Sequence, residues 1–211
     1  MRITYLFDPL CGWCYGATPA LERLSTLDDV RIELAPTGLF AGDHARPMDA
    51  QFAAHAWQND QRIQRLTGQV FSEAYRRNVL NQPGGLFDSA PATLAVVAVG
   101  LTDPAGQIAA LKALQRARYV DGRNNSDIAV VVEVLDAAGF TEAALQVRHP
   151  DAPVLAAYRQ SVAAARADMA RFGANGVPAL VVGDGANRHL LRTSALFCDF
   201  EQLAEDVRRA A

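Results

Sequence analysis

The hydrophobic period changes twice along the chain, and this change limits the folds that the chain can adopt. Residues 3–7 form a β-branched and aromatic run closed by Asp8-Pro9, as in a buried strand that ends in a turn. Apolar residues recur at helical spacing over 17–27, and residues 30–34 then alternate with period two. A strand, a helix and a strand joined this closely predict a right-handed parallel unit, which places Cys11 at the carboxyl edge of the first strand.

The middle of the chain, residues 40–173, is predicted to be helical. Ala, Leu, Gln and Arg dominate it, and turns rich in Pro and Gly divide it into five or six helices, of which the last covers about 153–172. Ser89 or Asp88 is a candidate N-cap for the helix that we expect to begin at Pro91. No Ser- or Gly-rich linker separates this stretch from the rest of the chain, so we interpret it as an insertion.

Period two returns after the helical stretch. Residues 177–182 and 189–193 are strand-like and flank a turn-forming cluster, which predicts a β-hairpin, and residues 200–210 form an amphipathic helix. The order βαβ, helical block, ββα predicts an α/β fold with a four-stranded mixed sheet. We expect a sheet domain made of residues 1–39 and 154–211, and a helical insertion domain made of residues 40–153.

Composition excludes several classes of protein. At 211 residues, half of them hydrophobic, the chain can bury a large core without disulfides or metals. The net charge is −3 and the basic residues are spread along the chain, so no nucleic-acid partner is predicted. The longest apolar run, residues 90–101, is interrupted by Pro91 and falls short of the roughly 20 residues that a membrane helix needs. No contact with a membrane is expected.

The role expected for the cysteines depends on the cell compartment. Residues 1–7 already fit the first strand rather than a secretory signal, so we expect a cytoplasmic protein. Thiols there are kept mostly reduced, and a close pair such as Cys11 and Cys14 is then more often catalytic or metal-binding than structural. Cys198 is expected to be a buried small hydrophobe.

The run Cys11-Gly12-Trp13-Cys14 suits reversible disulfide chemistry. Two cysteines separated by two residues on the first turn of a helix lie close enough to form a disulfide. The free N–H groups of the helix N-terminus stabilise a thiolate, so Cys11 is the predicted nucleophile. Cys14, one turn inside, is the predicted resolving thiol. Trp13 offers a flat apolar surface to substrate, and the pair Gly12-Trp13 tunes the stability of the reduced form.

A zinc site is the alternative for a cysteine pair at this spacing. It needs two more ligands, and none of the four histidines pairs with Cys198 or with another histidine at ligand spacing. We therefore predict no metal, and we interpret the histidines as surface residues.

These motifs together resemble the thioredoxin superfamily. The two cysteines at a strand-to-helix junction, Val177-Pro178 before a strand and the order of elements carry the resemblance, and the long helical insertion is similar to the DsbA family. Within that family, the run from Asp8 to Tyr15 resembles the FrnE-like branch. The resemblance implies a thioredoxin-like fold and a cis Val177–Pro178 bond, which would leave the Val177 backbone free to pair with an extended substrate.

The sequence departs from this family at one position. Many members carry a buried acid six residues before the first cysteine, and Tyr5 stands there instead. Asp8 is near enough in sequence to replace that acid as the proton acceptor of Cys14, or else it caps the turn, and the sequence leaves both roles open.

The resemblance implies a thiol–disulfide oxidoreductase or protein-disulfide isomerase that works through Cys11 and Cys14 on protein or peptide thiols and disulfides. No cofactor is expected beyond this redox pair, with glutathione as a candidate co-substrate. The direction of exchange depends on the potential of the pair relative to the glutathione pool. The alternatives are a glutathione-dependent isomerase or transferase similar to 2-hydroxychromene-2-carboxylate isomerase and the kappa-class glutathione transferases, and a non-enzymatic binding module with a helical groove.

Overall fold

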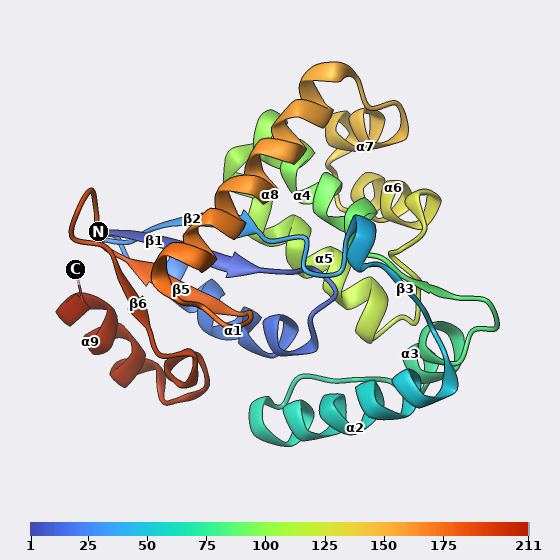
Figure 1. The fold of residues 1–211 in the computed structure, drawn as a ribbon, viewed down its shortest axis with the longest axis horizontal. Coiled ribbons are helices and arrows are strands. Elements are labelled where there is room, and N and C mark those ends of the chain that lie inside the picture. The colour runs from blue at the N-terminus through green and yellow to red at the C-terminus, as the bar shows by residue number, and fades with distance from the viewer. Residues whose placement is uncertain (211) are drawn as a thin grey trace.

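A central sheet with helices on both faces forms the core of the protein (Figure 1). The computed structural model describes residues 1–210. The strands are β1 (Arg2–Phe7), β2 (Arg31–Pro36), β3 (Arg46–Pro47), β4 (Leu86–Phe87), β5 (Ala179–Val182) and β6 (His189–Leu191). The α-helices are α1 (Gly12–Ser25), α2 (Ala50–Thr67), α3 (Glu73–Tyr75), α4 (Ala90–Thr102), α5 (Gln107–Tyr119), α6 (Ile128–Ala137), α7 (Thr141–Arg148), α8 (Ala152–Phe172) and α9 (Phe200–Ala210).

The main sheet has four strands in the order β2-β1-β5-β6. β1 and β2 are parallel, with Ile3 opposite Ile32, and α1 connects them. β5 is antiparallel to both β1 and β6, so the C-terminal strands form the predicted hairpin. The prediction of a four-stranded mixed sheet is confirmed, and Cys11 follows the end of β1 as expected.

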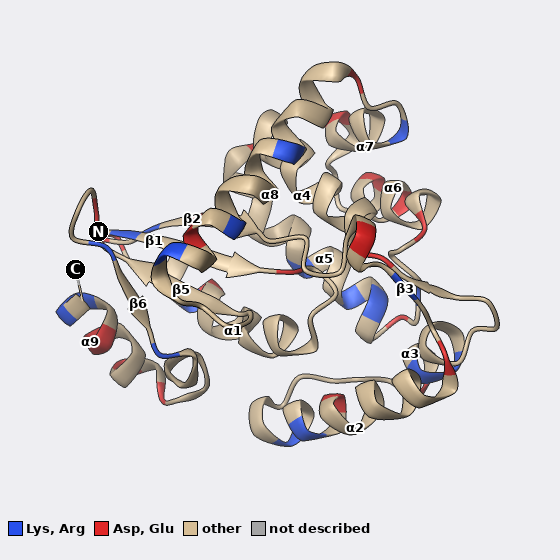
Figure 2. Cartoon of the chain, in the orientation of Figure 1, with Lys and Arg blue, Asp and Glu red and all other residues tan. Residues whose placement is uncertain are grey.

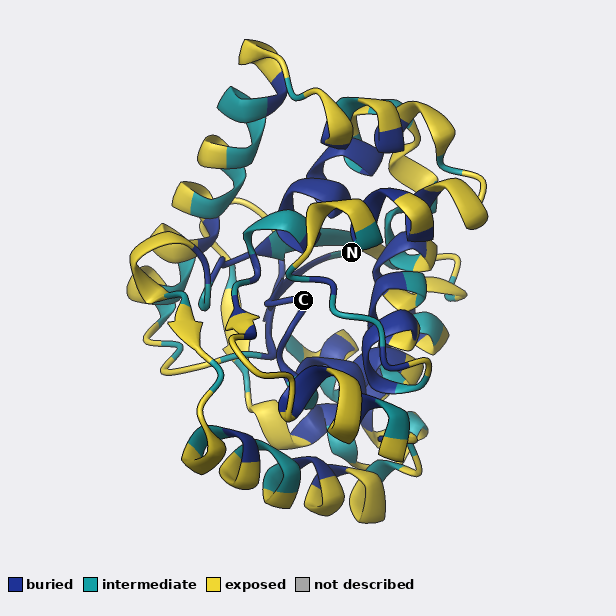
Figure 3. Ribbon diagram, turned by 90° about the vertical axis from the view of Figure 1, so that its right-hand side faces the viewer, coloured by how far each residue is buried: buried dark blue, intermediate teal, exposed yellow. Residues whose placement is uncertain are grey.

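Alternate residues of β1 enter two different packing layers. Ile3, Tyr5 and Phe7 belong to the large apolar cluster that continues through α1 into the inner helices, whereas Leu6 packs with Ala165 of α8 on the other face. This follows from the period of two in a strand, and it explains why the run is apolar at nearly every position. Figure 3 shows the buried residues gathered at the centre, with exposed residues on the outer turns of the helices.

The helical stretch contains six helices of eight or more residues, α2 and α4 to α8, in agreement with the predicted number. The helix α4 has no charged residue and contacts four other helices, α5 to α8, which is why it is apolar on all sides. Figure 2 shows charges of both signs dispersed over the outer helices and loops. The short ladder between β3 and β4 is not indicated by the sequence pattern.

The domain boundary between residues 153 and 154 stays a prediction. It falls in the first turn of α8, and this helix contacts both β2 and α4. Of the two candidate caps for α4, Asp88 accepts a hydrogen bond from the Ala90 N–H, while the hydroxyl of Ser89 is used elsewhere.

Candidate active site

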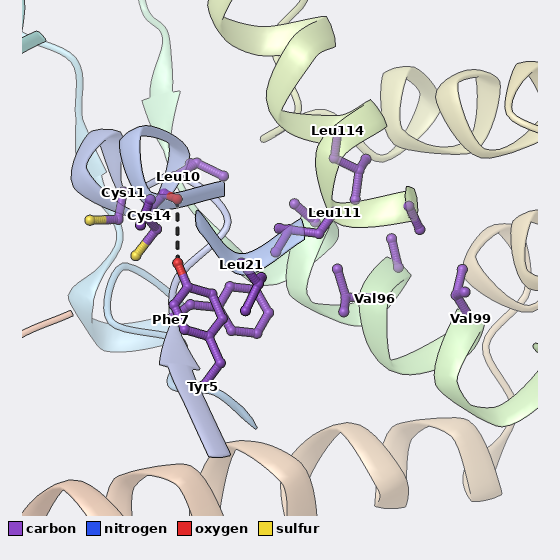
Figure 4. Packing of buried hydrophobic residues seen from close by; sticks show 14 of the residues in the cluster. Tyr5, Phe7, Leu10, Cys11, Cys14, Leu21, Val96, Val99, Leu111 and Leu114 are labelled. Carbon is purple, nitrogen blue, oxygen red and sulfur yellow. Dashed lines mark hydrogen bonds between the residues drawn. The ribbon is translucent and has the colours of Figure 1, made fainter. Parts of the chain in front are cut away.

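The two cysteines of the first turn of α1 lie at the carboxyl end of β1 as free thiols (Figure 4). Cys11 is the N-cap residue, with extended backbone angles, and 8% of it is exposed. Cys14 is completely buried. Of the two cysteines, Cys11 thus keeps the larger exposed fraction, and their division into nucleophile and resolving thiol stays a prediction.

The bond between Val177 and Pro178 is cis, as the resemblance implies. The thiol of Cys11 donates a hydrogen bond to the carbonyl oxygen of Val177, with the sulfur and the oxygen 3.5 Å apart. A groove of about 500 Å³ runs beside this bond and is lined by Trp13, Val177, Pro178 and Phe197 among others. The ring of Phe197 meets that of Trp13 edge to face, at 5.3 Å between centroids.

Tyr5 replaces the family's buried acid and contacts the second cysteine through its backbone. Its hydroxyl donates to the carbonyl oxygen of Cys14 at 3.3 Å, and its ring stacks on Phe7 (Figure 4). Burial holds the pKa of Tyr5 well above its usual range, so the phenol stays neutral. Burial, and then the neighbouring Cys11, raise the pKa of Cys14 well above that of an ordinary thiol.

Asp8 caps the turn before α1, which is one of the two roles left open by the sequence; the other role, proton acceptor of Cys14, stays a prediction. It is fully buried, and its carboxylate accepts hydrogen bonds from the Leu10 N–H at 2.9 Å, the Phe40 N–H at 3.3 Å and the Ser89 hydroxyl at 2.7 Å. Its carbonyl oxygen also accepts from the Cys11 N–H. Burial raises the pKa of Asp8, and these three donors oppose that rise.

A second buried carboxyl, Asp60 of α2, lies near the cysteine pair and is not singled out by the sequence. It is 5% exposed, and it accepts a hydrogen bond from the Tyr75 hydroxyl at 3.0 Å. Burial raises its pKa to about 7, against the opposing effects of that hydrogen bond and of Arg118. Asp60 stands among the polar residues of an amphipathic helix, where an acid is expected to face solvent, so no local signal marks it.

A pocket of about 190 Å³ connects Asp60 with Cys11. Leu10, Trp13 and Tyr119 also line it, so Trp13 stands between this pocket and the groove beside the cis-proline. The Tyr119 hydroxyl donates to the Leu10 carbonyl oxygen at 2.7 Å and ties α5 to the loop before Cys11.

Comparison with known proteins identifies the family. A model of the DSBA-like thioredoxin domain matches residues 2–205. The chain belongs to this family. It is similar to the solved structure of a cytosolic disulfide reductase, DsbM, from Pseudomonas aeruginosa, with 31% identity over all of both chains and a TM-score of 0.87. The structure of the same protein with glutathione has 30% identity, again over all of both chains, and a TM-score of 0.82.

A third solved structure is a putative protein disulfide isomerase from Nitrosomonas europaea. It has 26% identity, a TM-score of 0.80, and the match covers 99% of this chain and 96% of that one. Among the curated proteins, no match is found. This DSBA-like thioredoxin domain protein is therefore a thiol–disulfide oxidoreductase, and the prediction of a thioredoxin-like α/β fold with a helical insertion is confirmed.

Two other expectations concern residues outside the redox pair of this DSBA-like protein. Cys198 is exposed, so the expectation of a buried residue is wrong, because the turn Thr193–Phe197 ends before it and leaves its side chain at the surface. All four histidines are exposed, as predicted. Within residues 1–210, no group of three or more His, Cys, Asp or Glu could hold a metal ion, and no helix has the length and apolar character needed to cross a membrane.

Proposed function

We propose that the protein is a disulfide reductase in which Cys11 attacks the substrate disulfide. The observation that carries the proposal is the difference in accessibility between the two cysteines: Cys11 lines a pocket and keeps 8% of its surface exposed, whereas Cys14 is completely buried. A substrate sulfur can reach the first and not the second.

Cys14 then acts as the resolving thiol. Its sulfur attacks Cys11 in the mixed disulfide, closes the Cys11–Cys14 disulfide and releases the reduced substrate. Asp8, buried beside Cys14, is the proton acceptor in this proposal, since burial brings its pKa closer to that of a thiol. Gly12, Trp13, Val177 and Pro178 provide the surface on which the substrate lies.

Glutathione is the proposed electron donor that restores the two thiols, and the cytosol is the proposed location. Both proposals draw support from DsbM, which is described as a cytosolic disulfide reductase and was solved with glutathione. Protein or peptide disulfides are the proposed substrates. The resemblance to the FrnE-like branch stays a prediction.

Isomerisation is the second candidate function, and one observation favours it. A protein-disulfide isomerase needs an accessible first thiol and needs the second only to escape from trapped intermediates, and the similar Nitrosomonas europaea structure is described as a putative isomerase. A glutathione-dependent isomerase or transferase acting on a small molecule does not need Cys14 either. The second cysteine therefore separates reduction from both alternatives.

The first experiment is to equilibrate the protein with defined ratios of reduced to oxidised glutathione and to count free thiols by trapping. We expect a reversible two-electron transition that is lost in Cys11→Ser and in Cys14→Ser and is retained in Cys198→Ser, the matched control at an exposed cysteine. A potential well below that of the glutathione pool supports a reductase with another electron donor, and a potential near it supports the reductase restored by glutathione. A potential well above it supports an isomerase or oxidant. If no transition occurs while glutathione still binds, the glutathione-dependent isomerase or transferase is the better account.

Disulfide turnover then tests the two cysteines separately. With insulin or glutathione disulfide as substrate, Cys14→Ser should stop reduction after one mixed disulfide. If Cys14→Ser retains full turnover, the proposed reductase mechanism is wrong. If Cys11→Ser abolishes turnover but leaves peptide binding intact, the binding groove and the redox chemistry are separate properties of one protein.

A further inference from the structure

The pocket between α2 and the first turn of α1 contains a carboxyl that the reductase mechanism described above does not use. Asp60 and Cys11 both line this pocket, and most of its other walls are apolar or aromatic. The Tyr75 hydroxyl is bonded to Asp60, and the Tyr119 hydroxyl to Leu10. In the described part of the chain, the second carboxylate oxygen of Asp60, Oδ1, accepts no hydrogen bond. It is the group of this pocket that remains available to a substrate.

The fit between Asp60 and α1 is close. A Cβ atom added to Gly12 would lie 2.5 Å from Oδ1 of Asp60 and 3.2 Å from Ile63. The carboxyl therefore packs directly against the residue that follows Cys11, and Gly12 is the residue that leaves room for it. Side chains far apart in the sequence are brought together here by the packing of α2 on α1.

The surroundings of Asp60 contain features that favour the neutral acid and features that favour the carboxylate. Burial favours the neutral acid, and only the Tyr75 hydroxyl donates to it. The carboxylate, once formed, is stabilised by that hydroxyl and by Arg118, which is fully buried and lies over the rings of Tyr75 and Tyr119. The Nε and Nη2 atoms of Arg118 donate to no acceptor among residues 1–210. Its charge is thus not neutralised by any bonded carboxylate.

The charged and titratable groups that face Asp60 come from three elements. They are Tyr75 from α3, Arg118 and Tyr119 from α5, and Cys11 at the start of α1. Burial raises the pKa of both tyrosines, so they stay neutral in the range where Asp60 titrates, with its pKa of about 7. Among Asp60 and the two tyrosines, it is therefore the carboxyl that exchanges its proton near neutral pH.

We propose that the pocket receives the leaving half of the substrate disulfide and that Asp60 is the general acid that protonates its sulfur. The step follows from the proposed attack by Cys11. The Cys11 thiolate forms a bond to the nearer substrate sulfur, the substrate S–S bond breaks, and its electron pair goes to the farther sulfur, which takes the proton of Asp60. In this step the Cys11 sulfur is oxidised by one formal electron and the leaving sulfur is reduced by one; the second electron equivalent comes from Cys14 when it closes the Cys11–Cys14 disulfide. The Asp60 carboxylate regains from solvent the proton that Cys11 released when its thiolate formed.

The chemistry favours a carboxyl of this kind. An aliphatic thiol has a pKa of about 8.5, so its thiolate takes a proton readily from an acid that titrates near neutral pH. Positioned proton transfer contributes on the order of 100-fold or more in enzymes that use it. The preferred substrate is then a disulfide whose leaving thiol is basic, such as glutathione disulfide or an unactivated peptide disulfide.

The test compares leaving groups in a Cys14→Ser, Cys198→Ser background, which isolates the first step because Cys11 is then the only cysteine of the chain. Three reagents react with Cys11: glutathione disulfide, whose leaving thiol needs a proton; an aromatic disulfide of the dithiobis-nitrobenzoate type, whose leaving thiol is stable as an anion; and iodoacetamide, which releases iodide. We expect Asp60→Asn to slow the first reaction at pH 7 at least tenfold and to leave the other two within about twofold. Asp43→Asn, the same change at an exposed acid, should alter none of them.

A second variant makes the test independent of damage to the fold. The hydroxyl of Tyr75 stabilises the carboxylate of Asp60, so Tyr75→Phe should keep the acid and raise its pKa. The inflection near pH 7 in the rate with glutathione disulfide should then move to higher pH, whereas in Asp60→Asn it should disappear.

The outcomes separate this inference from the proposed function on which it rests. If the parent protein, with Cys14→Ser and Cys198→Ser, forms no mixed disulfide with either disulfide reagent, both the inference and the proposed function fail. If the parent reacts and Asp60→Asn slows all three reagents equally, Asp60 only supports the structure or deprotonates Cys11, and the inference is overturned. An unchanged rate with glutathione disulfide overturns it as well.

Discussion

Two buried carboxyls lie near the redox pair, and their surroundings differ. Asp8, in the loop between β1 and α1, accepts hydrogen bonds from two backbone N–H groups and one hydroxyl. Asp60, in the middle of α2, accepts one hydrogen bond, from a phenol. Burial raises the pKa of both groups, but only at Asp8 do several donors oppose it.

The comparison shows that the number of donors, and not burial alone, decides what a buried acid can do. Three donors make Asp8 part of the framework that holds the loop before Cys11, and they stabilise its carboxylate, the form that would accept the proton of Cys14 in the proposed function. Asp60 has one hydrogen-bond donor, so ionisation of its carboxyl lowers the stability of the fold. Groups at functional sites commonly have pKa values shifted in this way. Four predictions test this contrast.

The largest effect is expected at Asp8. Asp8→Ala leaves the Leu10 and Phe40 N–H groups and the Ser89 hydroxyl buried without their acceptor. Each such donor costs about 1–3 kcal/mol, so we expect the free energy of unfolding in urea to fall by roughly 3–5 kcal/mol. The control is Asp127→Ala, which removes the N-cap of α6 at an exposed site and should cost about 1 kcal/mol. Equal losses of unfolding free energy in the two variants would show that the buried carboxyl of Asp8 contributes no more than an exposed helix cap.

Asp60→Asn should act in the opposite direction. The pKa of Asp60 is about 7 in the folded protein and 3.8 in the unfolded chain. Between these two pH values, the folded state keeps a proton that the unfolded state has lost. The free energy of unfolding of the wild type therefore falls as pH rises from about 4 and levels off above about 7. The total fall is roughly 4 kcal/mol at most.

The asparagine does not titrate. The free energy of unfolding of the variant relative to the wild type should therefore increase by roughly 2–3 kcal/mol from pH 5 to pH 8. Urea unfolding at both pH values measures this gain. The exposed Asp43→Asn should show none, and a difference from the wild type that is the same at both pH values would contradict the shifted pKa of Asp60.

Gly12→Ala tests the contact between α1 and Asp60. Alanine normally favours a helix over glycine, but here the added Cβ meets Oδ1 of Asp60. We expect a loss of about 1–2 kcal/mol in the free energy of unfolding. In an Asp60→Ala background that loss should shrink by about 1 kcal/mol, and a double-mutant cycle measures the difference. Additive losses would mean that Ile63, and not Asp60, sets the space at Gly12.

Ser89→Ala should have the smallest effect. It removes one of the three donors to Asp8 and should cost about 1 kcal/mol. The lost donor stabilises the ionised form, so the pKa of Asp8 should rise further and the loss should be larger at pH 7 than at pH 4. Ser25→Ala, at an exposed hydroxyl that donates to the Glu22 carbonyl oxygen, is the control. A loss that does not depend on pH would show that Ser89 does not act through Asp8.

Several features of the site could be predicted from the sequence because they depend on neighbours along the chain. The hydrophobic period gives the order of strands and helices, and the cysteine pair follows directly after a strand and opens a helix. The role of Asp8 as a turn cap is of the same kind, since its backbone partner Leu10 is two residues away.

Other features depend on contacts between distant segments. The hydroxyl of Ser89 was a candidate helix cap, and only the approach of α4 to the loop of Asp8 gives it a different partner. Cys198 is apolar enough for a core and still lies at the surface, because its burial depends on where the turn before it ends.

The sequence by itself determined the fold class and the redox pair, because a strand period, a helix period and a two-residue spacing between cysteines are local properties. The tertiary structure alone decided that Asp60 lies beside Cys11, with Arg118 and Tyr75 around it. The sequence of a polar helix predicts that an acid within it is exposed. Only the packing of α2 against α1 removes the water that would otherwise keep the pKa of Asp60 low.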